Sequence, residues 1–107
     1  MQRVMVRYKV KPDQAAKNEK LVRAVYDELH RTDPAGFRYA TFQLEDGVTF
    51  IHLASVETDA GKNPLTGLES FKRFQAGIAD RCDEPPVVTA AREIGRASCR
   101  ERVYGTV

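Results

Sequence analysis

The chain of 107 residues is long enough for a single domain with a modest hydrophobic core. Its 17 basic and 15 acidic residues give a net charge of +2, which is too small to indicate a nucleic-acid partner or an anionic membrane. No apolar run approaches the roughly 18 residues that span a bilayer, and residues 1–4 lack the charged and apolar regions of a signal peptide. We therefore expect a cytoplasmic protein that does not enter a membrane.

Residues 94–107 differ in character from the rest of the chain. The ten residues from Ile94 to Val103 match the translation of a common sequencing-library adapter, which predicts that 94–107 is an artefactual tail and that residues 1–93 form the domain. Without the three arginines and one glutamate of this tail, 14 basic and 14 acidic residues remain and the net charge is 0. Cys99 belongs to the tail, so Cys82 stands alone, and neither a disulfide nor a metal site is expected.

The first part of the domain is predicted to be a strand followed by a helix. Side chains of residues 4–10 alternate between an apolar face and a mixed one, as in a strand. Pro12 and Asp13 are typical of a helix start. Pro34 and Gly36 end that helix. Its buried stripe, at the spacing of a helical face, consists of Leu21, Val22, Val25 and Leu29.

Residues 37–44 and 48–57 are predicted to form a hairpin, because Asp46-Gly47 is typical of a two-residue turn between antiparallel strands. The turn fixes which residues face each other. The predicted opposite pairs are Glu45 and Val48, Gln43 and Phe50, Thr41 and His52, Tyr39 and Ala54, and Phe37 and Val56. One face of the hairpin is then aliphatic, and the other combines aromatic rings with polar groups.

A second helix and a fourth strand complete the pattern. Asn63-Pro64 can cap a short turn before the helix. The apolar stripe of the helix consists of Leu68, Phe71, Phe74 and Ile78. Pro85-Pro86 is expected to end this helix, and residues 87–91 begin the last strand. The order βαββαβ predicts a ferredoxin-like α+β fold, with a four-stranded antiparallel sheet and two helices on one face.

In residues 63–78, which follow the strand at 48–57, the chain resembles the antibiotic-biosynthesis-monooxygenase-like branch of the dimeric α+β barrel superfamily. The resemblance covers about residues 3–92. It implies a homodimer whose two sheets pack face to face, and a pocket in each subunit between sheet and helices. Some members oxygenate quinol-like or polyketide aromatics with O2 and without metal or flavin, so no cofactor is expected. Others degrade haem, and many have no established activity.

Haem degradation is disfavoured for this chain. Haem-degrading members typically carry a tryptophan and a histidine ligand on the second helix. This chain has no tryptophan, and residues 69–75, which match that helix, contain no histidine.

His52, the one histidine on a predicted strand, is the candidate catalytic residue. A neutral imidazole could accept a phenolic proton and so leave an electron-rich anion able to reduce O2. The alternative is a structural imidazole that is hydrogen-bonded to Thr41. Tyr8 and Tyr39 could orient a phenolic ligand or simply pack, and Asn63 could bind a carbonyl or serve as a cap. The candidate substrate-binding residues are Tyr8, Tyr39, Thr41, Asn63, Phe71 and Phe74.

Three functions can be compared with these patterns. The first is a cofactor-independent monooxygenase acting on a small aromatic compound. The second is a non-catalytic dimeric module of the same fold that binds a small ligand or serves in stress responses. The third, RNA binding, is disfavoured, because the predicted third strand keeps Gly47 and Phe50 of an RNA-recognition motif but lacks its basic residue and two of its aromatics.

Overall fold

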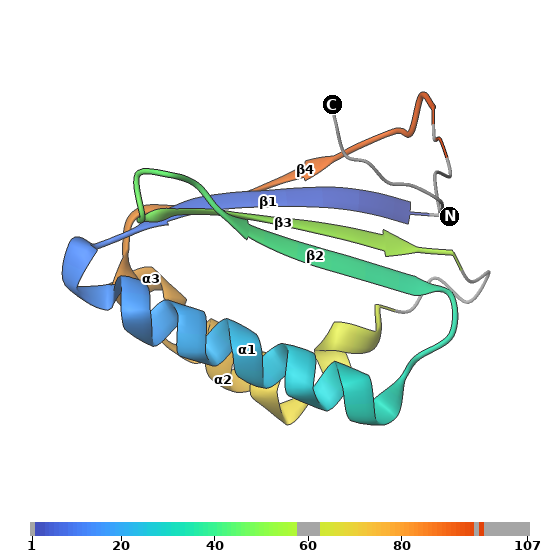
Figure 1. Ribbon diagram of the computed structural model, residues 1–107, viewed down its shortest axis with the longest axis horizontal. Coiled ribbons are helices and arrows are strands. Elements are labelled where there is room, and N and C mark those ends of the chain that lie inside the picture. Colours follow the sequence, from blue (N-terminus) through green and yellow to red (C-terminus); the bar gives the residue numbers. More distant parts are fainter. Residues whose placement is uncertain (1, 58–62, 96, 98–107) are drawn as a thin grey trace.

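Four antiparallel strands form one sheet in the order β2-β3-β1-β4 (Figure 1). The computed structural model describes residues 2–57, 63–95 and 97. The strands are β1 (Gln2–Val10), β2 (Phe37–Gln43), β3 (Thr49–Val56) and β4 (Cys82–Ala90). All helical segments lie on one face of the sheet. The predicted ferredoxin-like α+β fold is therefore confirmed.

The first helical region is one long helix. A 3-10 turn, η1 (Pro12–Gln14), leads into α1 (Ala15–Thr32), and Pro12 lies in the first turn as expected. The helix ends where Asp33 adopts a left-handed conformation with φ 42° and donates its backbone N–H to the Leu29 carbonyl. Val22, Val25 and Leu29 are buried as predicted, whereas Leu21 is only partly buried.

The hairpin has the predicted register, including the pairing of Thr41 with His52. The turn itself differs from the prediction. The Gly47 N–H donates to the Leu44 carbonyl, so the turn is centred on Glu45 and Asp46, and Gly47 follows it with φ +79°. Asp46 favours this longer turn because its carboxylate accepts hydrogen bonds from the two residues that follow Gly47.

The second helical region begins with the expected short turn, but the helix that was predicted after it is divided in two. The segments are η2 (Pro64–Gly67), α2 (Glu69–Ala76) and α3 (Ile78–Arg81), with Gly77 between the last two. The expected cap at Asn63 is confirmed, because its Oδ1 accepts the Leu65 N–H over 3.0 Å.

The prediction that Pro85-Pro86 ends the second helix was wrong. Strand β4 begins at Cys82 and contains both prolines. The pairing of β4 with β1 shifts register on both sides of Lys9, opposite this region. Proline donates no backbone hydrogen bond, so it is accommodated at an irregularity in an edge strand.

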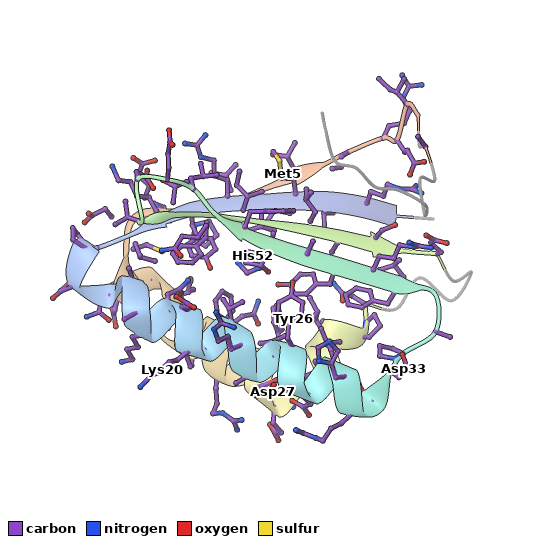
Figure 2. The ribbon with its side chains drawn as sticks, viewed as in Figure 1. Met5, Lys20, Tyr26, Asp27, Asp33 and His52 are labelled. Carbon is purple, nitrogen blue, oxygen red and sulfur yellow. The ribbon has the colours of Figure 1, made fainter. Side chains whose placement is uncertain are left out.

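The two faces of the sheet have different surroundings. Tyr8, Phe50 and His52 lie on the inner face, which the helices cover, and belong to or border the buried core. The aliphatic hairpin face predicted from sequence is the outer one. There Phe42 is 51% exposed and Leu53 42% exposed, and Met5 projects away from the helices (Figure 2).

Of the predicted artefactual tail, only residues 94, 95 and 97 are described. The boundary at residue 93 therefore remains a prediction.

Candidate functional site

A cavity of about 350 Å³ lies between the inner face of the sheet and the second helical region. Its walls come from all four strands and from η2, α2 and α3; no residue of α1 is among the described residues that line it. The predicted site residues that line it are Tyr8, Tyr39, His52, Asn63, Phe71 and Phe74. Thr41 does not line it, but contacts His52 from the neighbouring strand. The structure thus brings residues from distant parts of the sequence together around one cavity.

The lining is mostly apolar and carries no formal charge at neutral pH. Besides valine, leucine and phenylalanine side chains, it includes Tyr8, Tyr39, His52, Asn63, Thr66 and Gln75. No aspartate, glutamate, lysine or arginine is among the described lining residues. Such a cavity suits an uncharged, largely apolar ligand that a few hydrogen bonds orient.

His52 lies between the sheet and the helices (Figure 2) and is the centre of a hydrogen-bonded cluster. Its Nε2 lies 2.8 Å from the Tyr8 hydroxyl, and its Nδ1 lies 2.6 Å from the Tyr39 hydroxyl and 3.1 Å from Thr41 Oγ1. The imidazole is 4% exposed, and burial lowers the pKa of His52 to about 4. The ring is therefore neutral at pH 7. The hydrogen bond to Thr41 that was one of the predicted alternatives is present.

The tyrosines beside His52 are held in their neutral form. Burial raises the pKa of Tyr8 and of Tyr39, and this outweighs the lowering of the pKa by the Asn18 hydrogen bond at Tyr8 and by the Thr41 hydroxyl near Tyr39. The Tyr8 ring stacks on His52 at a centroid distance of 5.3 Å, and Tyr39 lies 5.6 Å from it. These contacts fix the positions of both hydroxyl groups.

Sequence reasoning missed two polar members of the cluster, Asn18 and Arg81. Asn18, on α1, is fully buried, and its Nδ2 donates to the Tyr8 hydroxyl over 2.8 Å. Arg81, at the end of α3, donates from Nε to Asn18 Oδ1 over 3.1 Å. A signal for Asn18 did exist, because it precedes Val22 by four residues and so falls on the apolar stripe of α1.

Arg81 is a buried cation, 3% exposed, with no carboxylate partner among the described residues. Its Nη2 donates to the Phe74 carbonyl over 2.7 Å, and the guanidinium carbon lies 5.2 Å from the centre of the Phe74 ring. Burial lowers the pKa of the Arg81 guanidinium. A Cβ at Gly77 would approach Arg81 Nη1 to 3.3 Å, so the glycine that separates α2 from α3 also leaves room for this side chain.

The two phenylalanines contribute differently. Phe74 is buried and packs edge-on against Tyr8, whereas Phe71 is half-buried and stacks on Phe74 at a centroid distance of 5.9 Å. Phe74 is thus core as well as cavity wall, and Phe71 is mainly wall. Asn63 combines its cap hydrogen bond with a place in the lining.

The described residues contain no group of three or more His, Cys, Asp or Glu side chains arranged to hold a metal ion. No described helix is long and apolar enough to cross a membrane.

No protein-family model matches the sequence, and no curated protein matches it. Solved structures do match. A candidate antibiotic biosynthesis monooxygenase from Nitrosomonas europaea has a TM-score of 0.74 at 18% identity, over 89% of this chain and 100% of that one. Rv0793 from Mycobacterium tuberculosis has a TM-score of 0.73 at 18% identity, over 91% and 98%. A further Nitrosomonas europaea protein, of unknown function, has a TM-score of 0.70 at 15% identity, over 91% and 92%.

The chain therefore has the ferredoxin-like α+β fold of antibiotic-biosynthesis-monooxygenase-like proteins. At these identities the likeness establishes the fold alone. Proteins of unknown function share it, so the chemistry of this chain has to be argued from its own cavity.

Proposed function

We propose that the cavity binds a small, uncharged aromatic compound of the quinol or polyketide type and that the protein oxygenates it with O2, without metal or flavin. The observation that carries the proposal is the buried His52 cluster in the wall of an uncharged, aromatic-lined cavity. The fold shared with structures described as antibiotic biosynthesis monooxygenases supports it. Tyr8, Tyr39, Thr41, Asn63, Phe71 and Phe74 would bind or shape the substrate.

For a hydroquinone, the reaction consumes one O2 and gives a hydroxyquinone and water. A proton of a substrate hydroxyl passes to His52 through a tyrosine hydroxyl that contacts the imidazole. The resulting substrate anion transfers one electron to O2. The two radicals combine at a ring carbon to form a peroxide anion, which takes back the proton held by His52 and becomes a hydroperoxide. Its O–O bond then breaks: one oxygen atom remains on that carbon as a carbonyl, and the other leaves as water together with the hydrogen of the same carbon.

The low pKa of His52 sets the energetic condition for this role. Moving a proton from a phenol of pKa about 10 to an imidazole whose pKa is about 4 costs roughly 8 kcal/mol before the ion pair is counted. A turnover of about 10 per second corresponds to a barrier of about 16 kcal/mol. The transfer therefore fits within the barrier of an ordinary enzyme, with His52 as a transient proton holder.

The test is incorporation of labelled oxygen. With 1,4-naphthohydroquinone and ¹⁸O2, we expect one ¹⁸O atom in the hydroxyquinone product, and we expect His52→Gln to abolish incorporation. His30→Gln, which changes the exposed histidine, is the matched control and should leave the label unchanged. Autoxidation without protein gives unlabelled naphthoquinone and supplies the blank. Equal labelling by wild type and by folded His52→Gln would refute a role for His52.

A second candidate function is ligand binding without chemistry. It is favoured by one observation: both ring nitrogens of His52 already have hydrogen-bond partners, as in a structural histidine. In that case the naphthohydroquinone would bind in the cavity, detected by chemical-shift changes at Phe71 and Phe74, and no label would be incorporated.

The proposal also includes a cytoplasmic homodimer formed through the outer face of the sheet. Its support is the exposed apolar surface of that face, where Phe42, Leu53 and Val87 are 51%, 42% and 63% exposed. Light scattering is expected to give twice the mass of one chain, and Leu53→Lys is expected to give a folded monomer. A monomeric wild type would refute this part of the proposal.

A further inference from the structure

We propose that Arg81 and Asn18 are positioning residues that, through Tyr8, hold His52 as its Nδ1–H tautomer, so that Tyr39 offers its hydroxyl proton to a carbonyl oxygen of the ligand. This inference deepens the proposed function and rests on it for the ligand only. The tautomer itself follows from contacts present without any ligand.

Arg81 sets the direction of the hydrogen-bond chain, because a guanidinium donates and never accepts. Its Nε–H lies 3.1 Å from Asn18 Oδ1, so the amide oxygen faces Arg81 and the amide NH2 faces Tyr8. Asn18 therefore donates to the Tyr8 oxygen over 2.8 Å. The Tyr8 hydroxyl keeps its own proton, and its remaining polar partner is His52 Nε2 at 2.8 Å.

The opposite tautomer leaves a buried donor without a partner. If Nε2 carried the proton, the Tyr8 oxygen would accept from both Asn18 and His52, and the Tyr8 O–H would have no acceptor among the described residues. Tyr8 is 2% exposed, and an unpaired buried donor is strongly unfavourable. Nε2 is therefore the acceptor and Nδ1 carries the proton.

The proton on Nδ1 determines whether the Tyr39 hydroxyl offers a ligand a hydrogen-bond donor or an acceptor. Nδ1–H donates to the Tyr39 hydroxyl at 2.6 Å, so Tyr39 accepts from His52 and keeps its own proton to donate. Thr41 Oγ1 lies 3.1 Å from Nδ1 and 2.9 Å from the Tyr26 hydroxyl. Tyr39 lines the cavity, where a ligand oxygen can accept its proton. The hydrogen-bond chain thus separates two roles: Tyr39 donates to a ligand carbonyl, and Tyr8 donates to the lone pair of Nε2 and can pass a proton to it. A ligand is therefore recognised through an acceptor oxygen.

The tautomer can be read directly by NMR on the intact protein at pH 7. Correlations between the ring nitrogens and the carbon-bound ring protons identify which nitrogen is protonated, and His30→Gln removes the signals of the second histidine. The expected result is a protonated Nδ1 and an unprotonated Nε2. A protonated Nε2 would overturn the proposal, whatever the cavity binds.

Asn18→Asp gives the most direct test of the positioning role, because it keeps the shape of the side chain and reverses the direction of the hydrogen bonds from residue 18 to His52. A carboxylate beside Arg81 accepts from Tyr8, so the Tyr8 oxygen becomes the acceptor for Nε2–H and Tyr39 donates to Nδ1. The expected result is a switch to the Nε2–H tautomer. Should this variant fail to fold, Arg81→Gln, which lets the Asn18 amide turn so that its oxygen accepts from Tyr8, is expected to raise the Nε2–H population. An unchanged tautomer in a folded variant would overturn the positioning role.

Two probes of similar size test the recognition step: 1-tetralone, which only accepts hydrogen bonds, and 1-naphthol, which also donates. We expect wild type to favour 1-tetralone, and the affinity ratio to move about tenfold toward 1-naphthol in Asn18→Asp. An identical ratio in both proteins would overturn recognition through an acceptor oxygen. If neither probe enters the cavity while Nδ1 is protonated, the proposed function fails and the assignment of the tautomer stands.

Discussion

The two helical regions cover the same face of the sheet in different ways. The first is one continuous helix, α1, with Val22, Val25 and Leu29 buried against the strands. The second is divided into η2, α2 and α3, and the cavity lies between these segments and the sheet. α1 contributes Asn18 to the polar cluster, but no side chain to the described cavity lining. Stability and ligand binding are therefore expected to separate between the two regions.

The first helical region is one long helix and the second consists of short segments, and this difference in length explains why the cavity lies under the second region. A continuous helix presents an unbroken stripe that packs closely on a sheet. The second helix is interrupted at Gly77, where φ −117° and ψ 15° depart from helical geometry, and Gln75 and Ile78 on either side of the interruption line the cavity. The break also admits the Arg81 side chain, which anchors the hydrogen-bond chain. The interrupted second region thus lines the cavity and also supplies Arg81, whose hydrogen bond to Asn18 begins the polar cluster.

The largest expected effect is the difference in stability and ligand affinity between a variant of the core and a variant of the cavity wall. Leu29→Ala, in α1, removes a buried side chain and is expected to lower the free energy of unfolding by about 3 kcal/mol while leaving the affinity for 1-tetralone unchanged. Phe71→Ala, in α2, removes a half-buried side chain, so we expect a smaller loss of stability and a clear loss of affinity. Urea unfolding and NMR titration measure the two quantities.

Equal losses of affinity in both variants would contradict the comparison, because Leu29 contributes nothing to the described cavity lining. Ala16→Ser, at an exposed position of α1, is a control that should change neither quantity.

A somewhat smaller effect concerns pH. The pKa of His52 is lowered from 6.5 to about 4 in the folded protein, so between these values the unfolded chain binds more protons than the folded one. The stability that neutral His52 contributes is fully present above pH 6.5 and is lost as pH falls toward 4. The change is on the order of 3 kcal/mol, measured by urea unfolding across this range. His52→Gln should remove most of it, and His30→Gln should not.

The sequence was sufficient to predict the hairpin register and the first helix, because both are set by local patterns. Alternation along two strands and a turn signal at residues 45–48 place Thr41 opposite His52, although the turn itself is centred on Glu45 and Asp46. The start of β4 was missed because residues 82–84, Cys-Asp-Glu, show no alternating apolar pattern, and the two prolines indicated a break. Their tolerance depends on the edge position of β4, which is a property of the assembled sheet.

The site was predictable in part for the same reason. Register alone places Tyr39, Thr41 and His52 on one face. The contact between Asn18 and Arg81 could not be found from sequence, because the two residues are 63 positions apart and meet only when the fold brings α3 close to the first turn of α1. An Arg at the end of a predicted helix is ordinarily exposed, and its burial follows from tertiary packing.

The smallest expected effect tests how the two helical regions are joined. Glu28, on α1, accepts hydrogen bonds from the backbone N–H and the hydroxyl of Ser70, in the first turn of α2, over 3.0 and 2.6 Å. These bonds lower the pKa of the Glu28 carboxyl, so their contribution is present above its ordinary pKa of 4.5 and is lost as pH falls below that value.

Glu28→Gln keeps an oxygen acceptor but removes the charge that favours a helix N-terminus, so we expect faster hydrogen exchange in the first turn of α2 and little change in α1. Glu19→Gln is the matched control on α1, because Glu19 pairs with Arg23 on its own helix. Faster exchange throughout both helices would mean that Glu28 supports the whole fold. A change confined to α2 would instead mean that the segments around the cavity open independently of the core beneath α1.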